Sequence, residues 1–193
     1  MALPPSDVSR TPLHTRSIRV NSFAREDGQW DLEAELIDVK AYDFPLLSGA
    51  GVHRAGDPVH HMHLRVTIND EFAITDAVAD YDAAPYNQSC TAIAPNYADL
   101  VGLNLLRNFR QVVKDRYGRT AGCTHMTELA YVLPTVAVQT MANRRRKEAE
   151  APGHAPKRPF QLDGCHALRA DGPVAKEFYP KWYVVPKDGA QGQ

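Results

Sequence analysis

The chain has few cysteines and no long apolar run, and both absences exclude classes of protein. Its three cysteines, Cys90, Cys123 and Cys165, are an odd number at wide intervals, which is typical of reduced thiols rather than a disulfide framework. No apolar run approaches the roughly 20 residues of a membrane-spanning helix. Residues 1–16 lack the apolar core of a secretory signal. We therefore expect a cytoplasmic protein.

The chain also lacks an excess of charge of either sign. It has 22 lysines and arginines against 23 aspartates and glutamates, for a formal net charge of −1. Such a balance provides no field that attracts nucleic acid or an anionic membrane. We expect a small-molecule substrate rather than either of these partners. The sequence leaves the oligomeric state open, a homodimer included.

Several strong motifs of catalysis and binding are absent. The chain has no C-x-x-C pair, H-E-x-x-H motif, P-loop or dinucleotide-binding glycine fingerprint. It also lacks the G-x-S-x-G turn of serine hydrolases. Any chemistry must therefore come from residues that the fold brings together.

The first half of the chain is rich in strand patterns. Alternation of apolar and polar residues predicts strands over 13–24, 30–40, 59–68 and 72–79. Asp27-Gly28 is a strong hairpin-turn signal between the first two. Residues 41–57 have no sustained period and predict a long loop. Sequential strands with short turns favour an antiparallel sheet of about four strands.

The second half is rich in helix patterns. Apolar spacing predicts helices over 95–102, 104–117 and 123–146, with Pro134 inside the last. Strands followed by helices predict an α+β fold, here as a single domain over 1–193. Within it we expect a flexible N-terminus (1–12), a polar linker (147–159) and a C-terminal tail (160–193) that docks on the body.

Cys123 opens the long predicted helix and is the first candidate functional residue. The N-terminus of a helix carries partial positive charge, which favours an ionised thiol. His125 and Glu128 are three residues apart, so they are neighbours on a helix. The alternative interpretation makes Cys123 a small buried residue and His125 a partly exposed neighbour of the helix cap.

Three histidines of the third predicted strand are the second candidate. Alternation places His60 on the apolar face of Met62, and His61 and His63 together on the opposite face. Two histidines at this spacing are a recurrent pair of metal ligands. The alternative is a solvated sheet face, which the neighbouring Arg65 favours because it disfavours a second cation nearby. An imidazole on the covered face, as predicted for His60, needs a polar partner.

The third candidate is the segment from Asp76 to Tyr86. Asp76 shares the apolar register of Ile74 and Val78, which predicts a buried carboxylate that needs a partner. Asp82 and Tyr86 flank a proline-containing turn, where Asp82 is either a functional carboxylate or a turn former.

Five short motifs follow one another along nearly the whole chain: Arg25-x-Asp27-Gly28-x-Trp30-Asp31, Asp38-x-Lys40-x-Tyr42-Asp43, Asp82-Ala83-x-Pro85-Tyr86, Ala121-Gly122-Cys123-Thr124-His125 and Gly164-Cys165-His166-Ala167-Leu168. This ordered set resembles a bacterial family catalogued as a domain of unknown function, number 2889. The resemblance implies a bacterial, cytoplasmic protein and carries no defined chemistry.

A second similarity concerns residues 63–71, the following Thr75-Asp76-Ala77, and Gly122-Cys123. They look like the paired strands and last cysteine of the NifU-type scaffold proteins that assemble iron–sulfur clusters. The resemblance implies a NifU-like core whose ligand positions fall here on 58–61, 82–86 and Cys123. Two of the three expected cysteines are missing. The resemblance therefore implies that five side chains lie close together in the fold: His60 or His61, Asp82, Tyr86, Cys123 and His125.

Together these features predict a hydrolase or lyase acting on a small organic metabolite. His125 or His60 would be the general base, oriented by Asp82 or Glu128. Tyr86 would donate a hydrogen bond, and Cys123 would be the nucleophile or a ligand. Aromatic residues in the loops and tail favour a flat substrate that is apolar or aromatic.

Two alternatives stay open. One is a metal-binding protein that holds Zn²⁺ or Fe²⁺ through His60 or His61, with Cys123, Asp82 and His125 as further ligands. The other is a non-catalytic accessory or assembly module. The cofactor is otherwise unknown.

Overall fold

The computed structural model describes residues 3–46, 49, 51–150 and 158–186. The chain forms two compact units, Met1–Met141 and Ala142–Gln193. All the elements of the sheet and the residues discussed below as candidate sites belong to the first unit.

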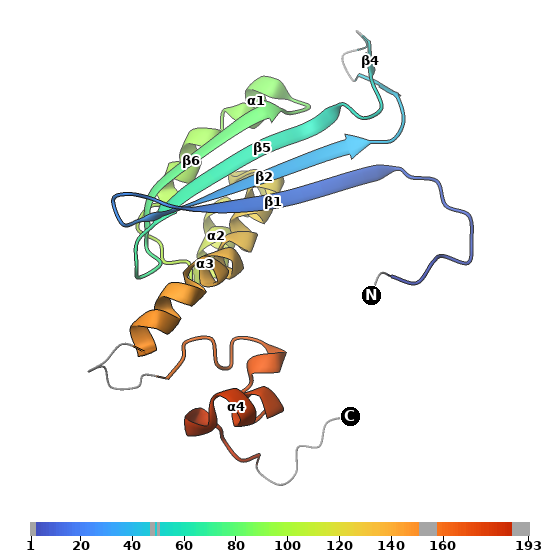
Figure 1. Ribbon diagram of the computed structural model, residues 1–193. Helices are drawn as coiled ribbons and strands as arrows, with labels where there is room; N and C mark the ends of the chain where they lie inside the picture. The colour runs from blue at the N-terminus through green and yellow to red at the C-terminus, as the bar shows by residue number, and fades with distance from the viewer. Residues whose placement is uncertain (1–2, 47–48, 50, 151–157, 187–193) are drawn as a thin grey trace. The chain divides into compact units, whose positions relative to one another are not determined.

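A four-stranded antiparallel sheet forms one layer of the first unit (Figure 1). Its strands are β1 (His14–Ala24), β2 (Trp30–Lys40), β5 (Pro58–Ile68) and β6 (Ile74–Ala83), in the order β1-β2-β5-β6. Gly28, in the turn between β1 and β2, has a positive φ of 81°, which a glycine adopts without strain. The predicted loop over 41–57 contains a small separate hairpin of β3 (Phe44–Pro45) and β4 (Val52–His53).

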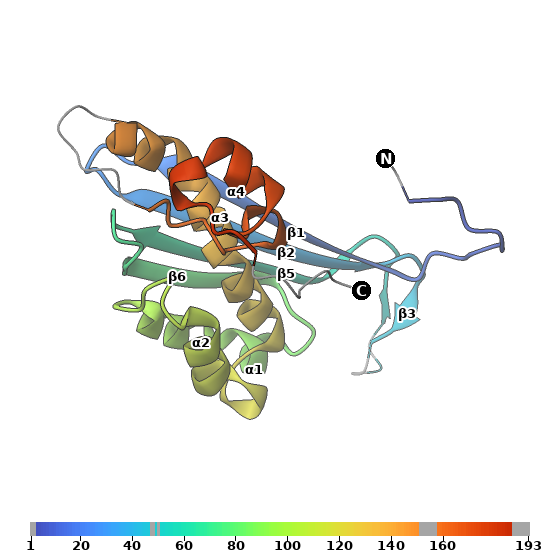
Figure 2. The same ribbon diagram turned by 90° about the horizontal axis from the view of Figure 1, so that it is seen from below.

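Helices cover one face of this sheet (Figure 2). They are α1 (Asn87–Thr91), the 3₁₀ segment η1 (Ala94–Leu100), α2 (Phe109–Tyr117), the 3₁₀ segment η2 (Arg119–Ala121) and α3 (Thr124–Glu150). The predicted helix over 104–117 begins only at Phe109, because Asn104 instead forms a β-bridge with Ala73. Strands followed by helices confirm the α+β fold.

The core lies between the sheet and α3. Leu32 and Leu36 of β2 join Met62 and Leu64 of β5 and the inward side of α3, including Leu129, in one buried cluster. The same alternation puts His60 on the covered face of β5 and leaves His61 and His63 on the open face, as predicted.

Asp76 is exposed rather than buried, so that prediction is wrong. The register between β5 and β6 shifts between Thr67 and Ile68, and an extra residue in one strand reverses which side chains face inward. Ala77 is therefore buried, whereas Val78 is 46% exposed. The alternation of inward and outward side chains that includes Ile74 is therefore reversed in β6 beyond this bulge.

The second unit contains the end of α3, the 3₁₀ segments η3 (His166–Leu168) and η4 (Pro180–Trp182), and α4 (Pro173–Phe178). Of the predicted linker, residues 147–150 are helical and 151–157 lie outside the described residues. Residues 3–12 form no helix or strand, and residues 1–2 and 187–193 are also outside the described part. Docking of the tail stays a prediction.

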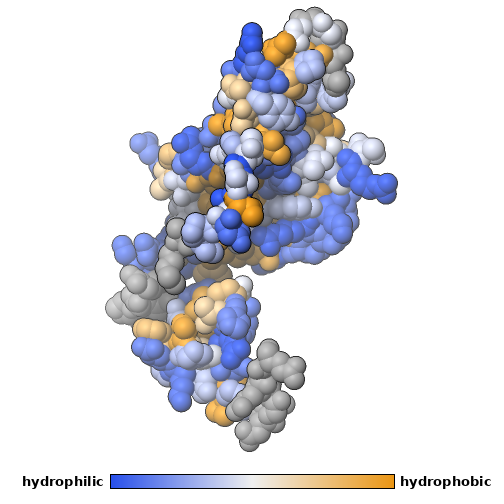
Figure 3. All heavy atoms as spheres, turned by 90° about the vertical axis from the view of Figure 1, so that its right-hand side faces the viewer, coloured by the Kyte–Doolittle hydropathy of each residue, from blue (hydrophilic) through white to orange (hydrophobic). Residues whose placement is uncertain are grey.

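The surface mixes polar and apolar side chains. Figure 3 shows hydrophobic groups interspersed with hydrophilic ones on the side of the molecule that it views. Among the described residues, no helix combines the length and the apolar character needed to cross a membrane.

Candidate functional site

A buried carboxylate, Asp38, lies at the centre of the candidate site. Asp38 is on the covered face of β2 and is only 2% exposed. Arg16 is its direct partner across the β1–β2 ladder. The Arg16 guanidinium donates two hydrogen bonds, Nε to Oδ1 and Nη2 to Oδ2, each 2.7 Å long. This bidentate pairing compensates the carboxylate for its loss of water.

Three imidazoles surround the same carboxylate. His14 Nε2 lies 3.1 Å from Asp38 Oδ1, and His60 Nδ1 lies 3.0 Å from Oδ2. His125, in the first turn of α3, places Nε2 at 3.5 Å from Oδ2. The rings of His60 and His125 are 3.9 Å apart between centroids. His60 therefore has the polar partner that its covered position requires.

The charges of this cluster follow from its burial. Burial by itself would raise the pKa of Asp38, but hydrogen bonds and charge from Arg16, with the His14 contact, lower it to about 2. Burial lowers the pKa of His60, and the nearby His125 adds to this effect. Burial, and then the charge of Arg16, lower the pKa of His125. At neutral pH the site therefore combines an ionised Asp38 carboxylate with neutral imidazoles at His60 and His125.

Cys123 lies directly before α3 and next to His125. Its carbonyl accepts the Thr127 N–H at 2.9 Å, which starts the helix. The backbone N–H of Cys123 donates to Tyr97 Oη at 3.0 Å, and the Tyr97 hydroxyl donates to the Cys123 carbonyl at 3.1 Å. Cys123 Sγ is 4.0 Å from His125 Nδ1. The thiol, His125 and Asp38 thus form a series in which one imidazole faces both other groups.

Tyr81 of β6 adds a buried hydroxyl near the thiol. Its oxygen has no hydrogen-bond partner among the described residues. Burial, and then the neighbouring Cys123 side chain, raise the pKa of Tyr81. The hydroxyl stays protonated and is available as a donor.

Gly122 allows Cys123 to take its position. A Cβ at residue 122 would lie 2.6 Å from the Tyr117 carbonyl oxygen and 2.7 Å from Tyr117 Cβ. We expect Gly122→Ala to lower the free energy of unfolding by about 1–3 kcal/mol, because the backbone must shift to relieve this contact. Urea unfolding measures the change, and Thr120→Ala, at an exposed neighbouring position, is the control. Equal stability of the two variants would contradict the prediction.

The structure brings some of the predicted residues together and separates others. His125 and His60 meet at Asp38, Cys123 adjoins His125, and Glu128 forms an ion pair with Arg16. Asp82 contacts His61 and His63 on the opposite face of the sheet. The carboxylate beside the imidazole bases is therefore Asp38, not Asp82.

Two further placements correct the expected convergence. His60, His61 and Cys123 do not form one metal site, because consecutive strand residues point to opposite faces. Tyr86, which precedes α1, is 58% exposed. No hydrogen bond between described residues joins it to Cys123 or His125.

Asp38, Arg16, His14 and Tyr81 were not predicted as site residues. The alternation from Trp30 through Leu36 extends to Asp38 and marks it as buried, so this carboxylate was detectable in the sequence. The pairing of Asp38 with its partners was not detectable, because those partners come from β1, β5 and α3.

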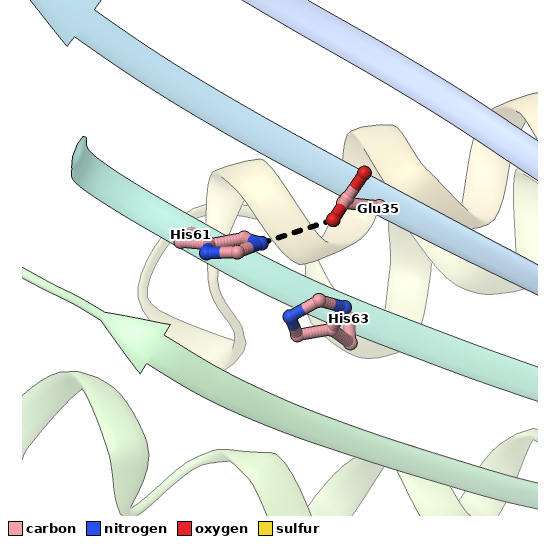
Figure 4. Close-up of side chains that lie close together, drawn as sticks. All are labelled: Glu35, His61 and His63. Carbon is pink, nitrogen blue, oxygen red and sulfur yellow. Dashed lines mark hydrogen bonds and ion pairs between the residues drawn. The ribbon is translucent and has the colours of Figure 1, made fainter. Parts of the chain in front are cut away.

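A second cluster lies on the open face of the sheet and is shown in Figure 4. His61 Nε2 is 3.1 Å from Glu35 Oε1, and His63 Nε2 is 2.9 Å from Asp82 Oδ2. The rings of His61 and His63 are 4.6 Å apart between centroids. Glu35 and His63 also line a depression of about 300 Å³ on this face.

Comparison with known proteins gives one match. A family model described as protein of unknown function (DUF2889) matches residues 14–139. This range includes every residue of the two clusters. No curated protein and no solved structure matches the chain. The similarity to iron–sulfur scaffold proteins thus finds no support.

Proposed function

The chain belongs to the DUF2889 family of proteins of unknown function, and we propose that it is a small cytoplasmic bacterial enzyme, a hydrolase or lyase of small organic molecules. One observation carries the proposal: His125 faces the Cys123 thiol through Nδ1 and the buried Asp38 carboxylate through Nε2. A thiol, an imidazole and a carboxylate in this order are the groups of a thiol-dependent hydrolase.

The order of the groups defines the proton transfers. A carboxylate accepts hydrogen bonds only, so Asp38 favours the His125 tautomer with the proton on Nε2. Nδ1 then accepts the thiol proton while Cys123 Sγ attacks the substrate carbonyl carbon. When the tetrahedral intermediate collapses to a thioester, the leaving group takes that proton from Nδ1. Attack of water on the thioester, with its proton passing to Nδ1, releases the acid and restores the thiol.

The start of α3 supplies the electrostatic support that such a reaction needs. The first N–H groups of a helix have no partners within the helix, and Cys123 directly precedes them. Backbone N–H groups in this position stabilise negative charge on a substrate oxygen. The protonated Tyr81 hydroxyl is a further donor beside the thiol.

A lyase reaction would use the imidazoles without a covalent intermediate. The Nδ1–H of His60 donates to Asp38, which leaves Nε2 as a proton acceptor for abstraction from a substrate carbon. In that case Cys123 is dispensable. Covalent trapping on Cys123 therefore separates the two reaction classes.

We expect 4-nitrophenyl acetate, a simple activated ester, to acetylate Cys123. Peptide mass spectrometry locates the acetyl group and measures how fast it appears. The exposed Cys165 provides an internal reference thiol. Faster acetylation of Cys123 than of Cys165, and its loss in Cys123→Ala, support the hydrolase. If Cys123 is acetylated no faster than Cys165, Cys123 is not an activated nucleophile. That is the result which the lyase and accessory roles predict.

A metal ion at the same site is the second candidate. Asp38, His60 and His125 offer ligand atoms that all lie within 4.8 Å of one another. However, Arg16 already donates to both Asp38 oxygens, and a divalent cation would have to compete with it. Zinc binding that is lost in His60→Ala would favour this candidate.

A further inference from the structure

We propose that the open face of the sheet carries a separate site for a divalent transition metal ion such as Zn²⁺, with Glu35, His61 and His63 as its ligands. Each of these residues offers one ligand atom, and the three atoms lie within 4.8 Å of one another (Figure 4). The site uses none of the groups around Asp38 and is independent of the proposed reaction.

The strand register builds this arrangement. His61 and His63 are two residues apart on β5 and project from the same face. Glu35 of β2 is the direct partner of His63 across the ladder. Because the β2–β5 register is unbroken from the Glu35–His63 pair to the Ile37–His61 pair, the backbone positions of the three residues are fixed before an ion arrives.

Both ring nitrogens of His61 face carboxylate oxygens. Its Nε2 lies 3.1 Å from Glu35 Oε1, and its Nδ1 lies 3.4 Å from Asp82 Oδ2. A neutral imidazole has only one N–H, so one of these nitrogens turns a lone pair toward a carboxylate oxygen. A metal ion bound by His61 and Glu35 removes this conflict, since both the lone pair and the carboxylate are donors to it. An imidazolium ion is the competing explanation.

The neighbouring groups leave the ligand atoms available. Arg19 pairs with the other Glu35 oxygen, Oε2, at 3.1 Å, so this guanidinium does not compete with an ion for Oε1, which faces His61 Nε2. Asp82 Oδ2 lies 2.9 Å from His63 Nε2. A carboxylate on one imidazole nitrogen orients the ring and raises the basicity of the other nitrogen, as in many zinc sites.

Two histidines and one carboxylate are the donor set of zinc sites that retain an open position. Water would occupy that position in the resting protein. The depression beside the cluster is lined by Arg19 and Arg65 and by the carboxylates of Glu33, Glu35 and Asp80, so its side chains carry no excess of positive charge.

Titration of metal-free protein with ZnCl₂, followed by calorimetry, tests the site. We expect one ion per chain and at least tenfold weaker binding in His61→Ala, His63→Ala and the size-conserving Glu35→Gln. His60→Ala is the matched control, because it removes the adjacent imidazole from the opposite face. Circular dichroism checks that each variant is folded.

Substitution of Co²⁺ identifies the ligands directly. Visible absorption of cobalt with nitrogen and oxygen ligands, lost in His61→Ala and kept in His60→Ala, supports the proposal. A cobalt–thiolate band would place the ion at Cys123 and overturn it. Absence of metal binding would also overturn the proposal, in favour of an imidazolium ion at His61. Metal binding that requires His60 and not His61 would overturn it in favour of a site at the Asp38 cluster.

Discussion

Replacement of Asp38 by alanine is expected to lower the free energy of unfolding by about 2–3 kcal/mol, because it removes a buried carboxylate that accepts charge-assisted hydrogen bonds and leaves Arg16 with Glu128 as its ion-pair partner. Arg16 donates to both carboxylate oxygens, and His14 and His60 also contact them. Urea unfolding of the two proteins measures the difference. Asp76→Ala is the matched control: it removes a carboxylate from an exposed strand position and should change stability by less than about 0.5 kcal/mol.

The contribution of Asp38 also predicts a pH dependence. Its pKa is about 2 in the folded protein against an ordinary value of 3.8. A lowered pKa stabilises the fold above the unfolded-state value, and this contribution is lost as the pH falls through the folded-state value. It corresponds to about 2 kcal/mol. The stability difference between wild type and Asp38→Asn should therefore narrow from about pH 4 to pH 2, and a constant difference would contradict the assignment.

Replacement of His125 by alanine is expected to slow acetylation of Cys123 by about 10²–10⁴-fold, the usual contribution of a positioned general base. The rate of acetylation by 4-nitrophenyl acetate is measured as a function of pH. In the wild type it should fall as the pH decreases through the His125 pKa, which burial places below 6.5. The alanine variant should lose this step in the profile.

His53→Ala provides the control for this experiment, since His53 lies in the β3–β4 hairpin and its Nε2 donates to the Asp57 carbonyl at 3.1 Å. It should leave both the rate and its pH profile unchanged. If His125→Ala behaves like His53→Ala, the contact between Cys123 and His125 has no catalytic role. Acetylation of Cys165 in each sample corrects for differences in reagent.

Local sequence patterns predicted most of the elements and several of the site residues. Alternation in β5 separated His60 from His61 and His63, because successive strand residues face opposite sides whatever surrounds them. Cys123 was predicted at the start of a long helix, and α3 begins at the next residue. These features depend on neighbours in the chain and are therefore visible in the sequence.

The partners of those residues were harder to predict. Asp82 was expected beside Cys123, but the β5–β6 bulge and pairing place it against His61 and His63. Asp76 was expected to be buried, and the same bulge turned it outward. A single inserted residue reverses the strand positions that follow it, up to the next irregularity, which here lies between His61 and Met62. Nothing in the local pattern of β6 marks where the insertions fall.

The sequence by itself determined the class of fold, the two faces of β5 and the position of Cys123 on a helix terminus. Only the tertiary structure decided which carboxylate meets which imidazole. Asp38 and Glu35 are both on β2, yet one is joined to Arg16, His60 and His125 under the helices and the other to His61 on the open face. The physical reason is that these contacts depend on the register between distant strands and on the packing of α3, which no local periodicity specifies.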